Sequence, residues 1–309
     1  MAKQIREWQP KPHRAVNYNV NAVQKCIDKH GYVLASPKLD GVRALIKLTA
    51  NGLLVTSREG IRIRSLDERL PGMAKELRRL GISMLGVVLD CELYIKGISF
   101  DEASGHIRRH SALPLELDVR IGVFDITEPA TVTGRQPGRV GLQHRIDYLR
   151  SVLLGERSLF EYVPHVACAS KWAIETMYAG YRAKGYEGLV LKDPDLPYRN
   201  GKVTGWWKLK PDITEDGTVV GYVWGDEAKA NANKIVGFEV LLESGETVRA
   251  TGLTKAQMAE YTDSYEDERD GKIGRYCEVK AMERTASGSL RHPSFKCWRD
   301  LDAAKGIKL

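Results

Sequence analysis

The sequence predicts an α+β protein with two domains, a larger mixed α/β domain followed by a smaller β-barrel. From Gly31 to Lys210, apolar runs of strand length alternate with stretches of helical periodicity. After Pro211 the pattern changes to short runs bounded by glycine turns, which is typical of a small barrel. We therefore expect a first domain at residues 1–210 and a second domain at residues 211–309.

Local patterns place most elements of these domains. Apolar residues that recur every three or four positions predict helices, whereas runs of apolar and β-branched residues predict strands. The expected helices cover residues 20–29, 70–80 and 145–153. The expected strands of the first domain cover residues 32–35, 44–48, 85–89, 119–124, 189–191 and 206–210. In the second domain, strands are expected at residues 217–224, 236–242, 247–250 and 276–282.

The composition favours a soluble, intracellular protein. A chain of 309 residues with 43% hydrophobic residues can bury sizeable cores. It has no run of 18 apolar residues, and its N-terminus lacks the apolar core of a signal peptide. The five cysteines are scattered without a CxxC spacing, and the seven histidines show no metal-ligand spacing. We expect reduced, mostly buried thiols, with neither a disulfide framework nor a zinc site.

Positive charge is concentrated in the first domain. Residues 1–210 carry 33 basic and 22 acidic side chains, a net charge of +11, whereas residues 211–309 carry 14 and 18, a net charge of −4. A basic domain attracts polyphosphate or nucleic acid with a salt-sensitive affinity. A merely soluble basic surface would have the same composition, and charge does not distinguish DNA from RNA as the partner.

The segment Lys-Leu-Asp-Gly-Val-Arg at residues 38–43 carries the most chemical information. It lies between two expected strands, so Lys38 falls at a strand end or turn where its amine can face a ligand. Gly41 lets the backbone pass close to that ligand, and Arg43 adds a fixed positive charge. A lysine must lose its proton before it can attack phosphorus, and nearby positive charge favours that loss. Taken alone, the segment also fits an ordinary charged turn.

Four later segments follow in a fixed order and supply acidic, aromatic and basic residues. They occupy residues 90–94, 121–125, 187–192 and 206–210. With residues 38–43, they resemble motifs III, IIIa, IV, V and I of the covalent nucleotidyltransferases, the superfamily of ATP-dependent DNA ligases, RNA ligases and mRNA capping enzymes. Such an order across most of the chain is hard to obtain by chance.

Two segments of the second domain make the resemblance more specific. Residues 237–245 and 288–295 look like the corresponding parts of the small bacteriophage-type ATP-dependent DNA ligases. The resemblance implies a mixed α/β adenylation (nucleotidyltransferase) domain followed by an oligonucleotide-binding (OB) fold barrel.

The resemblance also assigns a role to each candidate site residue. Lys38 would be the catalytic residue and carry the nucleotide covalently. Glu187, and with it Glu92, would bind the metal, because carboxylates at strand ends suit a hard cation; Glu92 is also a candidate for a ribose hydroxyl. Phe124 would stack on the adenine. The other nucleotide-binding candidates are Arg43, Arg58, Lys192, Lys208 and Lys210.

Alternation along a strand places Lys208 and Lys210 on one face, where both amines can meet one phosphate. A solvated edge strand would show the same lysines. Further candidates for contacts to DNA or phosphate are Arg58, Arg199, Lys202, Arg291 and Arg299. One departure concerns motif VI, which in many members ends in Arg-x-Asp-Lys. Here residues 299–302 lack the final lysine, so the residues that orient pyrophosphate are left open between Arg291 and Arg299.

The function implied by the resemblance is ATP-dependent sealing of nicks in duplex DNA, with a lysyl-AMP intermediate, a 5′-adenylated DNA intermediate and attack by the 3′-hydroxyl. The cofactors implied are ATP, whose AMP is carried covalently, and Mg²⁺, for which Mn²⁺ is expected to substitute. We expect a monomer that acts on nicked double-stranded DNA, has no membrane partner and works in the cytoplasm, that of the host cell if the protein is phage-encoded.

Three alternatives remain at this point. An RNA ligase or an mRNA capping guanylyltransferase would share Lys38 and the order of the motifs. A non-catalytic OB-type nucleic-acid binder would have the same domains but would not form a covalent adenylate.

Overall fold

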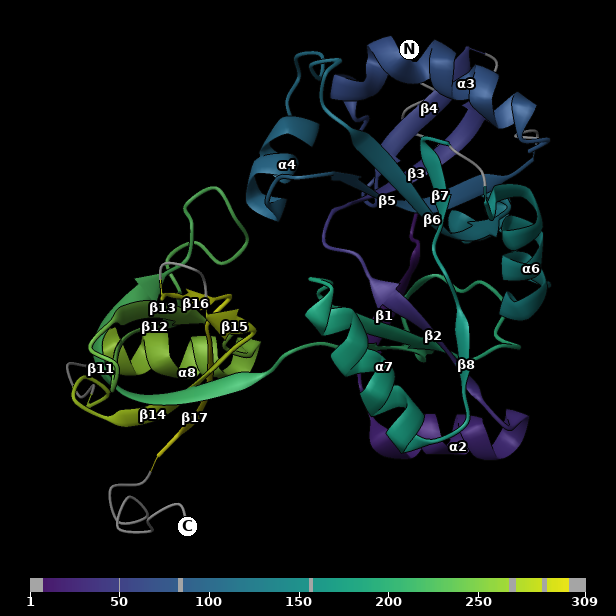
Figure 1. Ribbon diagram of the computed structural model, residues 1–309. Coiled ribbons are helices and arrows are strands. Elements are labelled where there is room, and N and C mark those ends of the chain that lie inside the picture. Colours follow the sequence, from purple (N-terminus) through teal and green to yellow (C-terminus); the bar gives the residue numbers. More distant parts are fainter. Residues whose placement is uncertain are drawn as a thin grey trace. The chain divides into compact units, whose positions relative to one another are not determined.

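The computed structural model describes residues 8–49, 51–82, 86–155, 158–266, 271–284 and 288–299. The chain divides into two compact units, Met1–Leu209 and Lys210–Leu309 (Figure 1). The first unit contains two five-stranded sheets with helices packed against them, and the second contains a closed barrel. The α+β fold class is confirmed.

Sheet A of the first unit combines strands from both ends of that unit. Helices α2 (Val20–His30) and α7 (Lys171–Ala183) pack on one face of it, where Val23, Ile174 and Leu191 belong to one buried cluster. Helix α2 ends at Gly31, whose φ of 80° is a left-handed conformation that glycine adopts without strain. The strand order is β1 (His13–Asn17), β10 (Gly201–Leu209), β9 (Gly188–Lys192), β2 (Val33–Lys38) and β8 (Val166–Cys168).

Sheet B is built from the central part of the first unit. Its core contains residues such as Ile46, Leu89 and Val123, which are completely buried. The strand order is β4 (Gly52–Ser57), β3 (Val42–Thr49), β5 (Val88–Ile95), β6 (Val119–Thr127) and β7 (Phe160–Tyr162). The helical elements of this region are η1 (Arg64–Arg69), α3 (Leu70–Arg79), α4 (Phe100–Ile107), α5 (Pro129–Val132) and α6 (Leu142–Leu153).

The second unit is a five-stranded closed barrel with an aromatic core. The rings of Phe238, Tyr261, Phe295 and Trp298 pack together with centroid separations of 4.9 to 6.2 Å. The barrel order is β11 (Ile213–Trp224), β12 (Ile235–Leu242), β13 (Thr247–Thr251), β17 (Ser294–Trp298) and β14 (Tyr276–Ala281). Helix α8 (Lys255–Glu266) and the short pair β15 (Glu283–Arg284) and β16 (Leu290–Arg291) complete the unit.

One local expectation about the first unit was wrong. Glu92 lies in the interior of β5 rather than at or beyond a strand end. The strand continues through Asp90 because Arg43 neutralises that buried carboxylate and the Tyr198 hydroxyl donates a hydrogen bond to it, so the charge does not end the strand. Four of the five cysteines are buried, as expected, and Cys297 is exposed. Within the described residues, the structure has no helix both long and apolar enough to cross a membrane.

Candidate active site

A cavity of about 420 Å³ lies between sheet A and sheet B. Alternation along β2, β9 and β10 turns Ser36, Val190 and Trp206 toward it, on the opposite side of sheet A from the core under α2 and α7. Its lining consists of Arg14, Ala15, Ser36, Pro37, Lys38, Leu39, Arg43, Arg58, Glu92, Phe124, Val190, Lys192, Lys202, Trp206 and Lys208. Eight of the residues singled out in the sequence therefore meet here, although they come from positions 38 to 208.

Lys38 and Glu187 form an ion pair at this cavity. Lys38 is the last residue of β2, and its carbonyl accepts a hydrogen bond of 3.1 Å from the Glu187 N–H just before β9. The backbone thus fixes the two side chains next to each other, and the Lys38 Nζ donates to the Glu187 carboxylate. The Lys38 side chain is 25% exposed and that of Glu187 only 10%. The amine is reachable from the cavity, and its partner is largely shielded from solvent.

Glu92 faces the same cavity from sheet B. Burial raises the pKa of this carboxyl to about 7, although the charges of Lys38 and Arg43 act in the opposite direction. The chain after Lys38 passes very close to this strand: a Cβ on Gly41 would lie 2.3 Å from the Leu93 carbonyl oxygen and 2.9 Å from Glu92 Cγ. The glycine is therefore required for this close contact with β5.

Arg43, which lines the cavity, is held in place by the buried Asp90. Its Nε and Nη2 donate hydrogen bonds of 2.8 and 2.6 Å to the two carboxylate oxygens, and the Tyr198 hydroxyl donates a third of 2.6 Å. Burial by itself would lower the pKa of Arg43, but the Asp90 carboxylate outweighs it and raises that pKa above its usual value. Arg43 is thus a permanent, fixed cation in the cavity wall.

Lys192 lies among aromatic rings. Its Nζ is 5.2 Å from the ring centroid of Phe124, 4.5 Å from that of Trp206 and 2.7 Å from Nε2 of His165. Burial lowers the pKa of Lys192 to about 7, and the charges of Asp125 and Asp90 oppose that shift. Burial also lowers the pKa of His165, with the charge of Lys192 as the second cause. This end of the cavity is therefore lined by the rings of Phe124 and Trp206, the latter stacked on His13 at 4.5 Å, and by an amine whose pKa is near neutral.

Basic side chains line another part of the cavity. Arg14 of β1 pairs in register with Lys202 of β10, and Lys208 lies further along the same strand. Arg58, in the turn after β4, is 57% exposed and bonded to the neighbouring Glu59. Guanidinium and ammonium groups gathered in this way suit the charged oxygens of a polyphosphate.

Other candidates from the sequence lie elsewhere. Lys210 follows the end of β10, begins the second unit, and is not part of the cavity lining among the described residues. Arg199 is exposed in the loop before β10. Arg291 contacts Glu283 at 3.2 Å. Arg299 contacts Asp216 at 3.1 Å and Glu278 at 3.2 Å within the barrel unit, and residues 300–302 of the motif VI segment lie outside the described residues.

Several residues of this site were not among the candidates from the sequence. Trp206 could have been found, because the alternation that aligns Lys208 also puts Trp206 on the cavity face. Asp90 could also have been recognised as part of the site, because a carboxylate inside an apolar strand needs a buried partner. Arg14 and His165 reach the site only through the pairing of β1 with β10 and the connection between β7 and β8, which local periodicity does not reveal.

Comparison with known proteins identifies the family. Residues 14–210 match the ATP dependent DNA ligase domain, and residues 211–274 match the DNA ligase C-terminal domain. This chain belongs to the ATP-dependent DNA ligases. It is 32% identical to the DNA ligase of Escherichia phage T7, with 93% of this chain and 95% of the relative covered. The DNA ligase of Enterobacteria phage T3 is 33% identical over the same shares.

A solved structure agrees with these relatives. The ATP-dependent DNA ligase from bacteriophage T7, in complex with ATP, superimposes with a TM-score of 0.58 at 30% identity and covers 95% of this chain and 100% of its own. The chain is thus an ATP-dependent enzyme of the small phage type that joins DNA. The family predicted from its motifs is confirmed.

Proposed function

We propose that the ligase works through a covalent lysyl-AMP on Lys38 and seals nicks in duplex DNA. The observation that carries the proposal is the Lys38–Glu187 pair at a cavity lined by basic and aromatic side chains. In the first step, Nζ of Lys38 loses its proton and attacks the α-phosphorus of ATP, and pyrophosphate leaves. AMP then passes to the 5′-phosphate at the nick, and the adjacent 3′-hydroxyl displaces it.

The cavity supports this chemistry with residues suited to each part of ATP. We assign adenine to the end formed by Phe124, Trp206 and Lys192, because rings stack on the flat faces of aromatic side chains. We assign the phosphates to Arg43 and Lys208, with the other basic lining residues beside them. Fixed cations of this kind stabilise the negative charge that develops as phosphorus is attacked.

The donor set also fits a divalent cation such as Mg²⁺. The Glu187 carboxylate accepts from Lys38, and the Glu92 carboxyl lies near enough to be influenced by the charges of both Lys38 and Glu187; hard cations prefer such oxygen ligands. When bound there, Mg²⁺ would offset phosphate charge and draw the Glu187 carboxylate away from the lysine ammonium. The Lys38 amine would then be released from its ion pair and could approach the α-phosphorus.

The remaining parts of the proposal concern the assembly. We assign residues 1–210 to nucleotide transfer and residues 211–309 to the OB-fold; the compact units and the matched family domains support a boundary close to Lys210. The enzyme is proposed to act as a monomer in the cytoplasm. Arg58, Arg199, Lys202, Arg291 and Arg299 remain the candidates for contacts with DNA or pyrophosphate.

The test of the covalent step uses Lys38→Ala with labelled ATP. We expect no covalent label after denaturing electrophoresis, yet slow closure of a nick that already carries 5′-AMP, because the last step needs no lysine nucleophile. Lys171→Ala, on an exposed part of α7, is the matched control and should label normally. Label retained by Lys38→Ala would overturn the assignment.

A further inference from the structure

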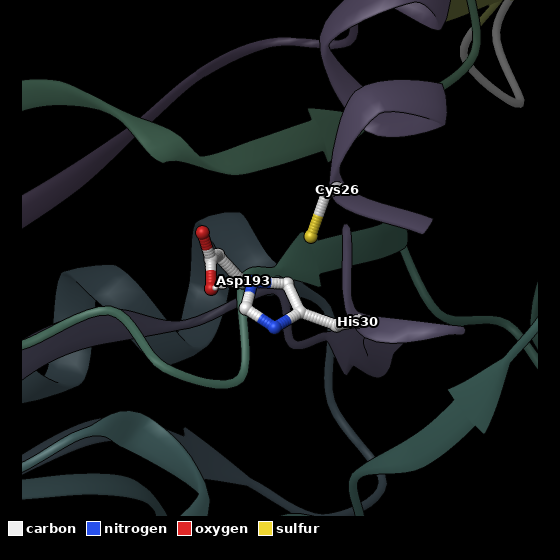
Figure 2. Close-up of side chains that lie close together, drawn as sticks. All are labelled: Cys26, His30 and Asp193. Carbon is white, nitrogen blue, oxygen red and sulfur yellow. Dashed lines mark ion pairs between the residues drawn. The ribbon is translucent and has the colours of Figure 1, made fainter. Parts of the chain in front are cut away.

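A cysteine, a histidine and an aspartate meet away from the cavity. Cys26 and His30 are four residues apart on α2 and so share one face of the helix, and Asp193 follows β9. Figure 2 shows the Cys26 sulfur and the Asp193 carboxylate pointing toward the His30 ring. One ligand atom from each residue lies within 4.8 Å of the others.

The surroundings of His30 indicate which ring nitrogen is available. The His30 side chain is only 9% exposed, and its buried Nε2 makes no hydrogen bond although it lies 3.3 Å from Asp193 Oδ1. The other nitrogen, Nδ1, lies 3.3 Å from a carboxylate oxygen of Asp195. A proton on Nδ1 facing Asp195 leaves the Nε2 lone pair directed at Asp193, which is the arrangement that carboxylates impose on metal-binding histidines.

We propose that Cys26, His30 and Asp193 bind one Zn²⁺ ion, with water as the fourth ligand and Asp195 orienting the histidine. Thiolate, imidazole and carboxylate are the ligands that zinc takes at 2.0 to 2.3 Å in tetrahedral sites. Asp193 is held in place for this role because its Oδ1 accepts a hydrogen bond of 3.0 Å from the Asp195 N–H.

Binding at this site would be coupled to proton release. Zinc binds the thiolate form of cysteine, so the Cys26 thiol gives its proton to solvent as the sulfur–zinc bond forms, and zinc affinity should fall as the pH is lowered.

The position of the site indicates a structural role. Cys26 belongs to the buried cluster between α2 and sheet A, whereas Lys38 lies on the cavity side. An ion here would tie the last turn of α2 to the segment after β9, and the negative end of the helix dipole would favour a cation. We expect zinc to stabilise the first unit without joining in the transfer of AMP.

The experiment measures zinc directly. Untagged protein, purified without chelator, is stripped and titrated with Zn²⁺ alone; metal content is measured by mass spectrometry, and Co²⁺ is added to reveal a thiolate-to-cobalt charge-transfer band. We expect about one zinc per chain in the wild type and a higher melting temperature with zinc than with chelator. Cys26→Ser and His30→Gln should lose both the zinc and the cobalt band.

Matched controls keep the result interpretable. Cys297→Ser and His144→Gln change an exposed cysteine and an exposed histidine elsewhere and should bind as the wild type does. Asp195→Asn should retain zinc with an affinity reduced about 10–100-fold. If Cys26→Ser fails to fold by circular dichroism, Asp193→Asn, which changes a side chain that is 20% exposed, tests the site instead. Absence of zinc binding by the wild type, or equal binding by folded ligand variants, overturns the proposal.

Discussion

Asp90 receives both donors of the Arg43 guanidinium fork, at 2.8 and 2.6 Å, and has no exposed side-chain surface. Removing the carboxylate would leave a buried cation without its partner, which typically costs about 3–5 kcal/mol. We expect Asp90→Ala to lower the free energy of unfolding by about that amount. Urea denaturation of the variant and the wild type measures the difference.

The chain supplies a matched control for this pair. Arg120 donates to Asp118 through the same two nitrogens, at 2.7 and 3.1 Å, but Asp118 is 49% exposed. Asp118→Ala should therefore lower the free energy of unfolding much less than Asp90→Ala does. Equal losses in the two alanine variants would contradict a special role for burial of the Arg43–Asp90 pair.

The raised pKa of Glu92 predicts a pH dependence on the acid side. Because its pKa is about 7 in the folded protein and 4.5 ordinarily, the folded state holds this proton more tightly, and stability is lost as the pH rises between these values. Glu92→Gln cannot lose this proton, so the variant avoids the loss of stability. We expect its free energy of unfolding to exceed that of the wild type by roughly 1–3 kcal/mol above pH 7 and by little near pH 4.5. Denaturant unfolding of the nucleotide-free proteins across this range checks the trend.

Lys192 predicts the opposite trend on the alkaline side. Its pKa is about 7 when folded and 10.5 ordinarily, so the unfolded state binds the proton more tightly and stability increases as the pH rises between the two. Lys192→Met should be more stable than the wild type below pH 7, and this advantage should vanish toward pH 10.5. A constant difference at every pH would show that packing rather than charge determines the effect.

The proposed metal role of Glu187 predicts defects in more than one step. Glu187→Ala should slow self-adenylation and also the sealing of a nick that already carries 5′-AMP, because charge stabilisation is lost in both. Single-turnover rates at several Mg²⁺ concentrations measure this. Glu175→Ala, on an exposed part of α7, is the control. Near wild-type rates for Glu187→Ala at saturating Mg²⁺ would exclude the metal role.

The proposed boundary predicts how a fragment behaves. Residues 1–210 keep every residue that lines the cavity and the net charge of +11, so the fragment should fold and hold ATP. It should lose much of its adenylation rate and most of its nick sealing, with residual DNA binding that falls steeply with salt. Single-turnover sealing of a pre-adenylated nick compares it with the full chain. Equal rates would make the second unit dispensable for the DNA steps.

The sequence predicted what depends on local pattern. The helix at 20–29 and the strand at 119–124 were found within a few residues, because periodicity and β-branched runs act over short distances. The gathering of Lys38, Glu92 and Lys208 was anticipated from motif order, and the register of β2 with β9 brings Lys38 next to Glu187.

What could not be predicted depends on distant pairing. Strand β1 has no clear pattern of its own and forms only beside β10, almost 190 residues later in the chain. Glu92 was misplaced at a strand end because Tyr198, whose hydroxyl donates to the buried Asp90, lies in a loop 108 residues later in the chain. The i, i+4 pair Cys26 and His30 becomes meaningful only once Asp193 is known to lie opposite it.

The make-up of the two sheets has a consequence for synthesis on the ribosome. Sheet B uses strands from residues 42–162 and can pair as soon as that stretch has emerged. Sheet A cannot form until the strands within residues 13–38 can pair with those within residues 166–209, and such long-range pairing forms slowly. We expect a nascent chain halted before β10 to have a complete sheet B. Its nucleotide pocket around Lys38 would not yet have formed. The enzyme could therefore be adenylated only after about two thirds of its chain has been translated.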